Sequence, residues 1–200
     1  MNRLPGLDIN TLNSDQLELF DRITKGKRST GRSREEFIGT DGAMIGPFNA
    51  MLHHPSVGQS LQRLGEVLRF EGGLSDIHRE IAVLTVGRHW RAEYEWWAHA
   101  QIARKVGISS DIIEAIKDQK PLPCNDIEIL TIHNFVRETL ENQRVSDETY
   151  SLTYKALGDL GIVELVILIG YYGIISGILN TFNVPLPRSE TSPFEEKDQT

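Results

Sequence analysis

Apolar residues recur at helical spacing along almost the whole chain, and this pattern constrains the fold more than any other feature. Leu61, Leu64 and Leu68, for example, are three and four positions apart, so they share one face of a helix. No long stretch alternates between apolar and polar residues with the period of two that a half-buried strand needs. The sequence therefore predicts an all-α fold.

Capping residues and glycines predict where these helices begin and end. Asn13 and Gln16 have the spacing of a capping box, Ser75 is placed to cap a helix, and Gly107 follows the last periodic residue of another. Residues 42–54 are rich in turn-forming residues, with Gly46-Pro47 as a breaker. The predicted helices cover residues 13–25, 55–71, 75–90, 92–106, 110–117 or 111–117, 125–142 or 126–142, 146–158 and 161–180.

Charge and cysteine content narrow the classes of function. The formal net charge of −7 over 200 residues argues against a surface that binds nucleic acid without regard to sequence. Cys124 is the single cysteine, so the chain can form no internal disulfide and no multi-cysteine metal site. A lone thiol fits a reducing compartment, and the N-terminal residues lack the apolar core of a signal peptide, so we expect a cytoplasmic protein.

The most apolar stretch, residues 162–179, is near the lower length limit for crossing a bilayer. Glu164 lies inside this stretch and no basic flank precedes it, so we expect a buried helix and no membrane. Gly173 and Gly177 are spaced so that another helix can approach closely. Together with the many predicted helices, this spacing predicts a homo-oligomer.

Basic residues gather around a loop or linker, residues 24–36, that is also rich in serine and glycine. They could steer an anionic substrate, and the alternative is an ordinary solvated loop. The basic residues of this region are Arg22, Lys25, Lys27, Arg28, Arg32 and Arg34.

Residues 91–99 contain the densest set of side chains that could take part in a reaction. Glu95 and His99 are four positions apart and therefore project from one face of a helix. A carboxylate beside an imidazole fixes the ring tautomer and raises its basicity, so the pair can pass a proton near neutral pH. Trp96 would add an apolar wall that shifts pKa values. The alternative is an ordinary surface ion pair beside core tryptophans.

Glu80 lies on the preceding predicted helix. Two helices with a short link pack antiparallel, which would bring Glu80 toward His99, and the alternative is a solvent-facing or salt-bridging acid. His53 and His54 lack a convincing third metal ligand, and the motifs Gly-x-Ser-x-Gly and Gly-x-Gly-x-x-Gly are absent. We therefore expect no metal, no dinucleotide cofactor and no nucleophilic serine.

Three segments in combination resemble the carboxymuconolactone decarboxylase family of the alkylhydroperoxidase-D-like superfamily. They are Gly46-Pro47-Phe48-Asn49-Ala50-Met51-Leu52, residues 79–99 and residues 158–180. The resemblance implies a helical bundle over residues 40–186, preceded by an N-terminal helix and basic arm (1–39) and followed by a polar, extended or disordered tail (187–200). It also implies assembly into a trimer, or as second choice a hexamer.

In the peroxidase branch of that superfamily, a Cys-x-x-Cys-x-x-x-His motif reduces hydroperoxides with the help of an upstream glutamate. Matching its histidine to His99 places the glutamate on Glu80 and the two cysteines on Ala92 and Glu95. Peroxide reduction needs a nucleophilic thiolate and a resolving thiol, and Cys124 lies on a different segment. An antioxidant dithiol peroxidase is therefore a disfavoured alternative.

The decarboxylase branch has the pattern Glu-His-Glu-x-x-x-His, which Glu93, Glu95 and His99 match, whereas Tyr94 replaces the first histidine. The resemblance implies a cofactor-free lyase for a small anionic lactone or related acid, with His99 as the proton donor held by Glu95 or Glu80. A further alternative is a non-catalytic oligomer that binds a small molecule. The residues expected to bind substrate are Arg88 or Arg91 at its carboxylate, Tyr94 at an oxyanion, Trp96 and Asn49.

Overall fold

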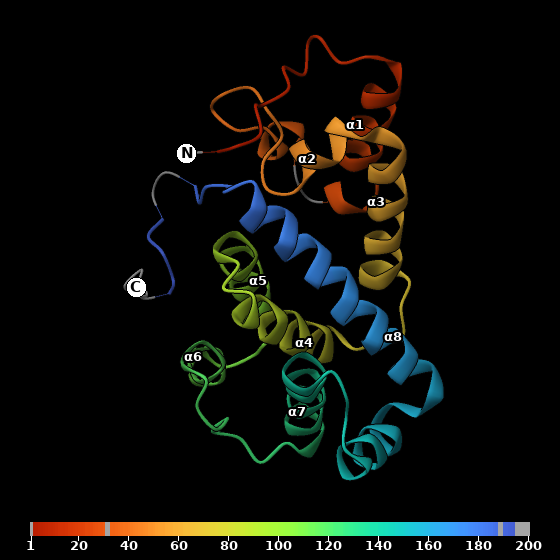
Figure 1. Ribbon diagram of the computed structural model, residues 1–200, viewed down its shortest axis with the longest axis vertical. Helices are drawn as coiled ribbons and strands as arrows, with labels where there is room; N and C mark the ends of the chain where they lie inside the picture. Colours follow the sequence, from red (N-terminus) through yellow and green to blue (C-terminus); the bar gives the residue numbers. More distant parts are fainter. Residues whose placement is uncertain (1, 31–32, 188–189, 195–200) are drawn as a thin grey trace. The chain divides into compact units, whose positions relative to one another are not determined.

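The computed structural model describes residues 2–30, 33–187 and 190–194, most of which are helical (Figure 1). The β contact among these residues is a single bridge between Ile38 and Met44, so the fold is all-α, as predicted. The α-helices are α1 (Ser14–Lys25), α2 (Phe48–His53), α3 (Pro55–Phe70), α4 (Asp76–His89), α5 (Glu93–Lys105), α6 (Ser110–Asp118), α7 (Ile127–Asn142) and α8 (Asp147–Thr181), and short 3-10 turns cover Lys27–Ser29 and Arg34–Phe37.

Side-chain caps begin three of these helices at residues that the sequence predicts. Asn13 forms the capping box of α1, Ser75 caps α4 and Asp126 caps α7. The cap of α6 is Ser109, one position before the first predicted candidate. The prediction that residues 42–54 form turns with Gly46-Pro47 as a breaker is wrong for its second half, where α2 forms. Pro47 immediately precedes the first turn of α2, a position where a proline is tolerated.

The chain divides by packing into two compact units. The first contains Met1–Gly72 and Ile178–Pro185, and there α1, α2 and α3 pack together around buried Leu19 and Leu52. The second contains Gly73–Gly177 and Leu186–Thr200. The sequence-based boundaries near residues 40 and 186 concern the extent of the family-like domain and stay a prediction.

Most of the basic residues predicted to steer a substrate have local partners in the first unit. The three pairs with carboxylates reduce the field that the segment projects into solvent, whereas the partners of Arg28 and Arg34 given below are uncharged. Arg32 lies outside the described residues. The contacts are Arg22 with Glu18 (2.7 Å), Lys25 with Asp21 (2.8 Å), Lys27 with Glu71 (2.7 Å), Arg28 with Gln62 (2.8 Å) and Arg34 over the ring of Phe20.

In the second unit, α4 is the central helix and contacts α5, α6 and α7 (Figure 1). Every residue from Arg79 to Gly87 is buried, and this run includes the charged side chains of Arg79 and Glu80. A helix buried on all sides belongs to a core, and charged groups there need partners of opposite charge. The burial of α4 therefore directs attention to what its charged residues contact.

The element α8 consists of two helices that meet at a kink, in agreement with the helices predicted over residues 146–158 and 161–180. Gly158, with φ 65° and ψ −174°, interrupts it in a backbone conformation that is almost restricted to glycine. Glu164, inside the apolar stretch, accepts hydrogen bonds from the backbone N–H groups of Gly73 (2.7 Å) and Leu74 (3.4 Å). By length and composition α8 is able to cross a membrane, which is weak support for a span because half of its most apolar window is buried.

Candidate active site

The turn between α4 and α5 sets the register of these two helices. Arg91 adopts a left-handed backbone conformation (φ 50°), and two successive amides after α4 donate back to the carbonyl oxygens of Arg88 (3.1 Å) and Gly87 (2.9 Å). This pattern is a Schellman motif, which ends a helix and redirects the chain. Glu80 and His99 are 19 residues apart with the turn near their midpoint, so the two side chains meet across the helix pair.

A buried cluster joins α4 and α5 through the imidazole of His99. Its Nδ1 lies 2.6 Å from Oε2 of Glu80, and its Nε2 lies 3.1 Å from Oε1 of Glu95. The relative exposure of Glu80 is 0%, that of Glu95 is 5% and that of His99 is 6%, so bulk water hardly reaches the cluster. The i, i+4 spacing of Glu95 and His99 and the antiparallel helix pair together account for the arrangement.

The cluster favours the charged form of the histidine. A neutral imidazole carries one N–H group, whereas an imidazolium can donate to both carboxylates at once. Burial lowers the pKa of His99, but the charges of Glu80 and Glu95 and their hydrogen bonds outweigh this effect and raise the pKa to about 9. Arg79, with Nε 3.5 Å from Oε1 of Glu80, adds a second positive charge beside the cluster, and its guanidinium also pairs with exposed Asp76 at 2.5 Å.

Aromatic rings enclose the cluster and its surroundings. Tyr172 on α8 meets the His99 ring edge-on, with centroids 5.1 Å apart. Trp96 packs against Phe194 from the C-terminal segment, with centroids 5.4 Å apart. Phe194 is buried, which the sequence-based interpretation of residues 187–200 as an extended or disordered tail did not predict. The apolar rings keep the local dielectric low and strengthen the interactions among the charged groups.

Three other predicted site residues have contacts of their own. Glu93 is exposed, and its carboxylate accepts a hydrogen bond from the hydroxyl of Ser192 (2.5 Å). Tyr94 is buried against Trp97, with centroids 5.4 Å apart. Asn49 lies in the first unit, where its amide accepts a hydrogen bond from the Leu7 N–H and donates one to the Pro5 carbonyl oxygen. The functional roles assigned to these three residues stay predictions.

Both predicted substrate-binding arginines lie beside Phe194. The guanidinium carbon of Arg88 is 5.2 Å from the Phe194 ring centroid, and that of Arg91 is 5.5 Å from it. Arg88 also lines a cavity to which Glu80, Glu95 and His99 contribute no wall.

Sequence reasoning missed two buried contacts. Tyr172 was seen only as part of an apolar helix, although its aromatic ring contacts His99. His133 on α7 lies 2.9 Å from the hydroxyl of Thr85 on α4. The signal for His133 was present, because it follows buried Ile129 by four positions and therefore lies on the apolar face of α7.

Among the described residues no group of three His, Cys, Asp or Glu side chains is placed to hold a metal ion.

This fold is that of the alkylhydroperoxidase AhpD core. A peroxidase-related protein with that core from Ralstonia eutropha JMP134 matches with a TM-score of 0.73 and 14% identity, covering 94% of this chain and 93% of that one. A peroxidase-related protein from Silicibacter sp. TM1040 matches with a TM-score of 0.70 and 11% identity, with the same coverage of both chains. At such identities the likeness concerns the fold alone. No protein-family model matches the chain, and a comparison with curated proteins finds no relative.

Proposed function

We propose that this chain is a cofactor-free acid–base enzyme, a lyase that acts on a small carboxylated lactone or a related organic acid in the manner of carboxymuconolactone decarboxylases. One observation carries the proposal: the buried imidazole of His99 has a carboxylate at each ring nitrogen, Glu80 at 2.6 Å and Glu95 at 3.1 Å. Such a group holds a proton at neutral pH and exchanges it with an adjacent carboxylate.

The chemistry assigned to this cluster is protonation of carbon. Decarboxylation breaks the bond between the carboxyl carbon and the substrate ring, releases CO2 and leaves the electron pair as a dienolate. His99 then donates its proton to the ring carbon, while Glu80 and Glu95 hold the imidazole in place. The proton that His99 loses is replaced from solvent through a carboxylate, so the cycle consumes one proton for each CO2 released. A low local dielectric strengthens the attraction between the imidazolium and the developing negative charge.

Substrate recognition requires a cation for the substrate carboxylate. Of the two predicted arginines we favour Arg91, because Arg88 lines a cavity to which the cluster residues contribute no wall. An arginine guanidinium binds a carboxylate through two parallel hydrogen bonds, which orients the group that leaves as CO2. Tyr94 as an oxyanion donor and Trp96 as an apolar wall complete the proposed site.

The test measures CO2 release from carboxymuconolactone by the purified chain and by two variants, His99→Gln and Glu95→Gln. Loss of a positioned acid–base group is expected to lower kcat by roughly 100- to 10,000-fold. His54→Gln, which changes an exposed histidine in the first unit, is the matched control and is expected to keep full activity. Equal turnover by wild type and His99→Gln would sink the proposal.

The same preparation tests the other candidates by consumption of an organic hydroperoxide. Peroxide consumption that Cys124→Ser abolishes would replace the lyase with a thiol peroxidase. If neither activity is present, carboxymuconolactone is rejected as the substrate, and a non-catalytic protein that binds a small molecule becomes the better description.

We also propose that the chain forms a homo-oligomer, a trimer before a hexamer. Exposed apolar side chains on α8 support this assembly, since Val163 is 58% exposed, Ile167 43% and Ile174 52%. These residues recur at helical spacing and form one continuous stripe. An exposed apolar stripe of this kind is typical of a surface that another chain covers.

A further inference from the structure

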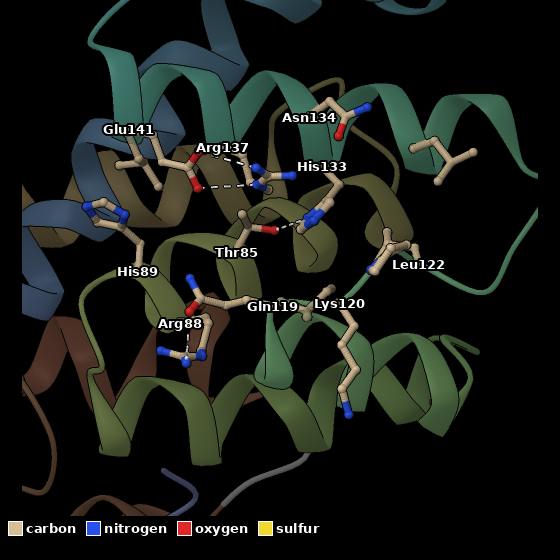
Figure 2. A pocket seen from close by; sticks show the side chains of 14 residues that line it. Thr85, Arg88, His89, Gln119, Lys120, Leu122, His133, Asn134, Arg137 and Glu141 are labelled. Atoms are coloured by element: carbon tan, nitrogen blue, oxygen red, sulfur yellow. Dashed lines mark hydrogen bonds and ion pairs between the residues drawn. The ribbon is translucent and has the colours of Figure 1, made fainter. Parts of the chain in front are cut away.

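A second candidate site lies in a cavity of about 440 Å³ on the second unit (Figure 2). Its walls come from α4, the end of α6 with the segment that follows, and α7. Thr85 lines it and follows Glu80 by five positions on α4, so their side chains are about 140° apart around the helix. The cavity therefore lies on a different side of α4 from the His99 cluster. Its volume is within the range of small-molecule pockets.

A buried histidine forms the polar floor of this cavity. The hydroxyl of Thr85 donates to the carbonyl oxygen of Ile81 (2.7 Å), so toward Nδ1 of His133, 2.9 Å away, it acts as an acceptor. His133 is 8% exposed, and with its proton on Nδ1 a neutral ring carries a lone pair on Nε2. Among the described residues Nε2 has no hydrogen-bond partner. The floor thus presents an acceptor that a ligand donor can satisfy.

Electrostatics keep this ring neutral at physiological pH. Burial, together with the positive charge of Arg137, outweighs the opposite effect of Glu141 and lowers the pKa of His133 to about 4. A neutral ring with a fixed tautomer is an acceptor and not a second donor at Nε2. The ligand group that faces it is therefore a hydroxyl or an amine.

The walls of the cavity are mixed, because five apolar side chains share them with the polar side chains of His89, Gln119 and Asn134. The apolar part of the lining favours a ligand with an apolar body between its polar groups. The apolar lining residues are Ile116, Pro121, Leu122, Leu130 and Leu140.

The mouth carries three cations and one acid. Arg137 is paired with Glu141 through two contacts of 3.3 Å, and Lys120 is paired with Asp118, which is outside the lining, at 2.8 Å. Arg88 differs, because among the described residues no carboxylate lies within ion-pair distance of its guanidinium. Asp118 acts on the charge of Arg88 from beyond ion-pair distance and the Phe194 ring lies 5.2 Å from its guanidinium carbon, so a ligand anion would be its first directly paired carboxylate.

The partners of Arg88 orient it without neutralising it. Its Nε donates to the backbone carbonyl oxygen of Lys117, and one terminal nitrogen donates to Oε1 of Gln119 (3.1 Å). These neutral acceptors fix the plane of the guanidinium, and a fixed plane favours binding of a carboxylate.

We propose that this cavity binds a hydroxylated aromatic carboxylic acid, with its carboxylate at Arg88, its ring against the apolar lining residues and its hydroxyl donating to Nε2 of His133. The site is separate from the proposed catalytic cluster and stands whether or not that cluster is a lyase. An aromatic ring matches the cavity because it holds the two polar groups at opposite ends of a rigid apolar body.

The test uses 4-hydroxyphenylacetate as the probe and isothermal titration calorimetry as the measurement. Two relatives each lack one group: phenylacetate has no hydroxyl, and 4-methylphenol has no carboxylate. Saturable binding of the probe to the whole chain is expected, with each relative bound about tenfold more weakly or worse, since each loses one buried polar contact.

Variants assign each polar group to its residue. His133→Phe keeps the ring volume and is expected to erase the preference for the probe over phenylacetate. Arg88→Gln is expected to erase the preference over 4-methylphenol. Arg104→Gln is the matched control, because Arg104 is an exposed arginine of α5 outside the cavity, and both preferences should survive it.

Two results would overturn the proposal. One is the absence of saturable binding at millimolar probe. The other is an affinity ratio of the probe to phenylacetate that His133→Phe leaves unchanged, or a ratio of the probe to 4-methylphenol that Arg88→Gln leaves unchanged. Leu140→Trp keeps the test decisive if His133→Phe fails to fold. It adds a large side chain to the cavity at a partly exposed wall position and leaves His133 and Arg88 unsubstituted. Binding that persists in a folded Leu140→Trp variant would place the ligand elsewhere and reject the site.

Discussion

His99 and His133 are both buried imidazoles, yet their surroundings move their pKa values in opposite directions. Burial lowers the pKa of each, because a charged ring loses its hydration. At His99 two carboxylates reverse the effect and raise the pKa to about 9. At His133 the partner is a neutral hydroxyl, and the pKa falls to about 4. At neutral pH the His99 ring is therefore protonated and can donate a proton, whereas the His133 ring is neutral and has a lone pair that can accept a hydrogen bond.

This contrast predicts a stability maximum near pH 6.5. The folded pKa of His99 is above its unfolded value of about 6.5, so its contribution is complete below pH 6.5 and is lost as pH rises toward 9. The folded pKa of His133 is below 6.5, so its contribution is complete above pH 6.5 and is lost as pH falls toward 4. Each contribution is on the order of 3 kcal/mol. Urea unfolding between pH 4 and pH 9, a window set by these values, measures both limbs.

The variants separate the two limbs. His99→Gln should flatten the alkaline limb and keep the acid one, and His133→Phe should do the reverse. Alkaline destabilisation that is undiminished in His99→Gln would contradict the assignment of that limb to this residue.

Local sequence patterns gave the approach of the cluster residues as one of two interpretations. The spacing of Glu95 and His99 and the short link to the helix of Glu80 allow these three side chains to meet, and the same pattern also fits an ordinary surface ion pair and a solvent-facing Glu80. Full burial of the cluster was not foreseeable, because it depends on rings such as Tyr172 from a distant helix. The contact between Thr85 and His133 spans 48 residues and depends on how α7 packs on α4, which no local pattern encodes.

At the scale of elements, Gly158 controls the course of α8. Its φ of 65° and ψ of −174° lie in a region that side chains disfavour, so Gly158→Ala is expected to destabilise the fold by about 1–3 kcal/mol. The space around it is open, so strain in the backbone and not a clash is the cause. Chemical denaturation measures the change in the free energy of unfolding.

Ala156→Gly is the control, because it makes the reverse exchange two positions earlier, in helical backbone. There glycine is the worse residue, and a loss of roughly 0.5–1 kcal/mol is expected from helix propensity alone. A Gly158→Ala variant as stable as wild type would show that α8 straightens without penalty.

Helix ends were predictable to the extent that local chemistry sets them. The capping box at Asn13 and the cap at Ser75 depend on hydrogen bonds within one turn, and both are present. The break at Gly158 was predictable in the same way, because glycine is the residue that most readily ends a helix, and the backbone there is non-helical. The burial of Phe194 was missed, since a tail rich in Pro, Ser and Glu gives no local sign of an anchor.

For the whole molecule, the exposed stripe on α8 predicts a defined oligomer. Light scattering should give a mass of about 68 kDa for the trimer, three times the 22.6 kDa of one chain. Ile174→Glu places a charge in the stripe and should shift the mass toward one chain, because burial of an unpaired charge is costly. Leu17→Glu changes a comparably exposed leucine on α1 and should leave the assembly intact. A wild-type mass near 23 kDa at micromolar concentration would refute the assembly.

Cys124 gives the chain a natural handle for spectroscopy. It is partly exposed, it is the single cysteine, and it follows Leu122 of the cavity wall by two positions. A maleimide dye would therefore attach at one known point without any engineered substitution. Because the dye would lie beside the mouth of the cavity, its emission colour and brightness would respond when that space fills. The unmodified chain can thus be turned, in one labelling reaction, into a fluorescent sensor for screening metabolite collections.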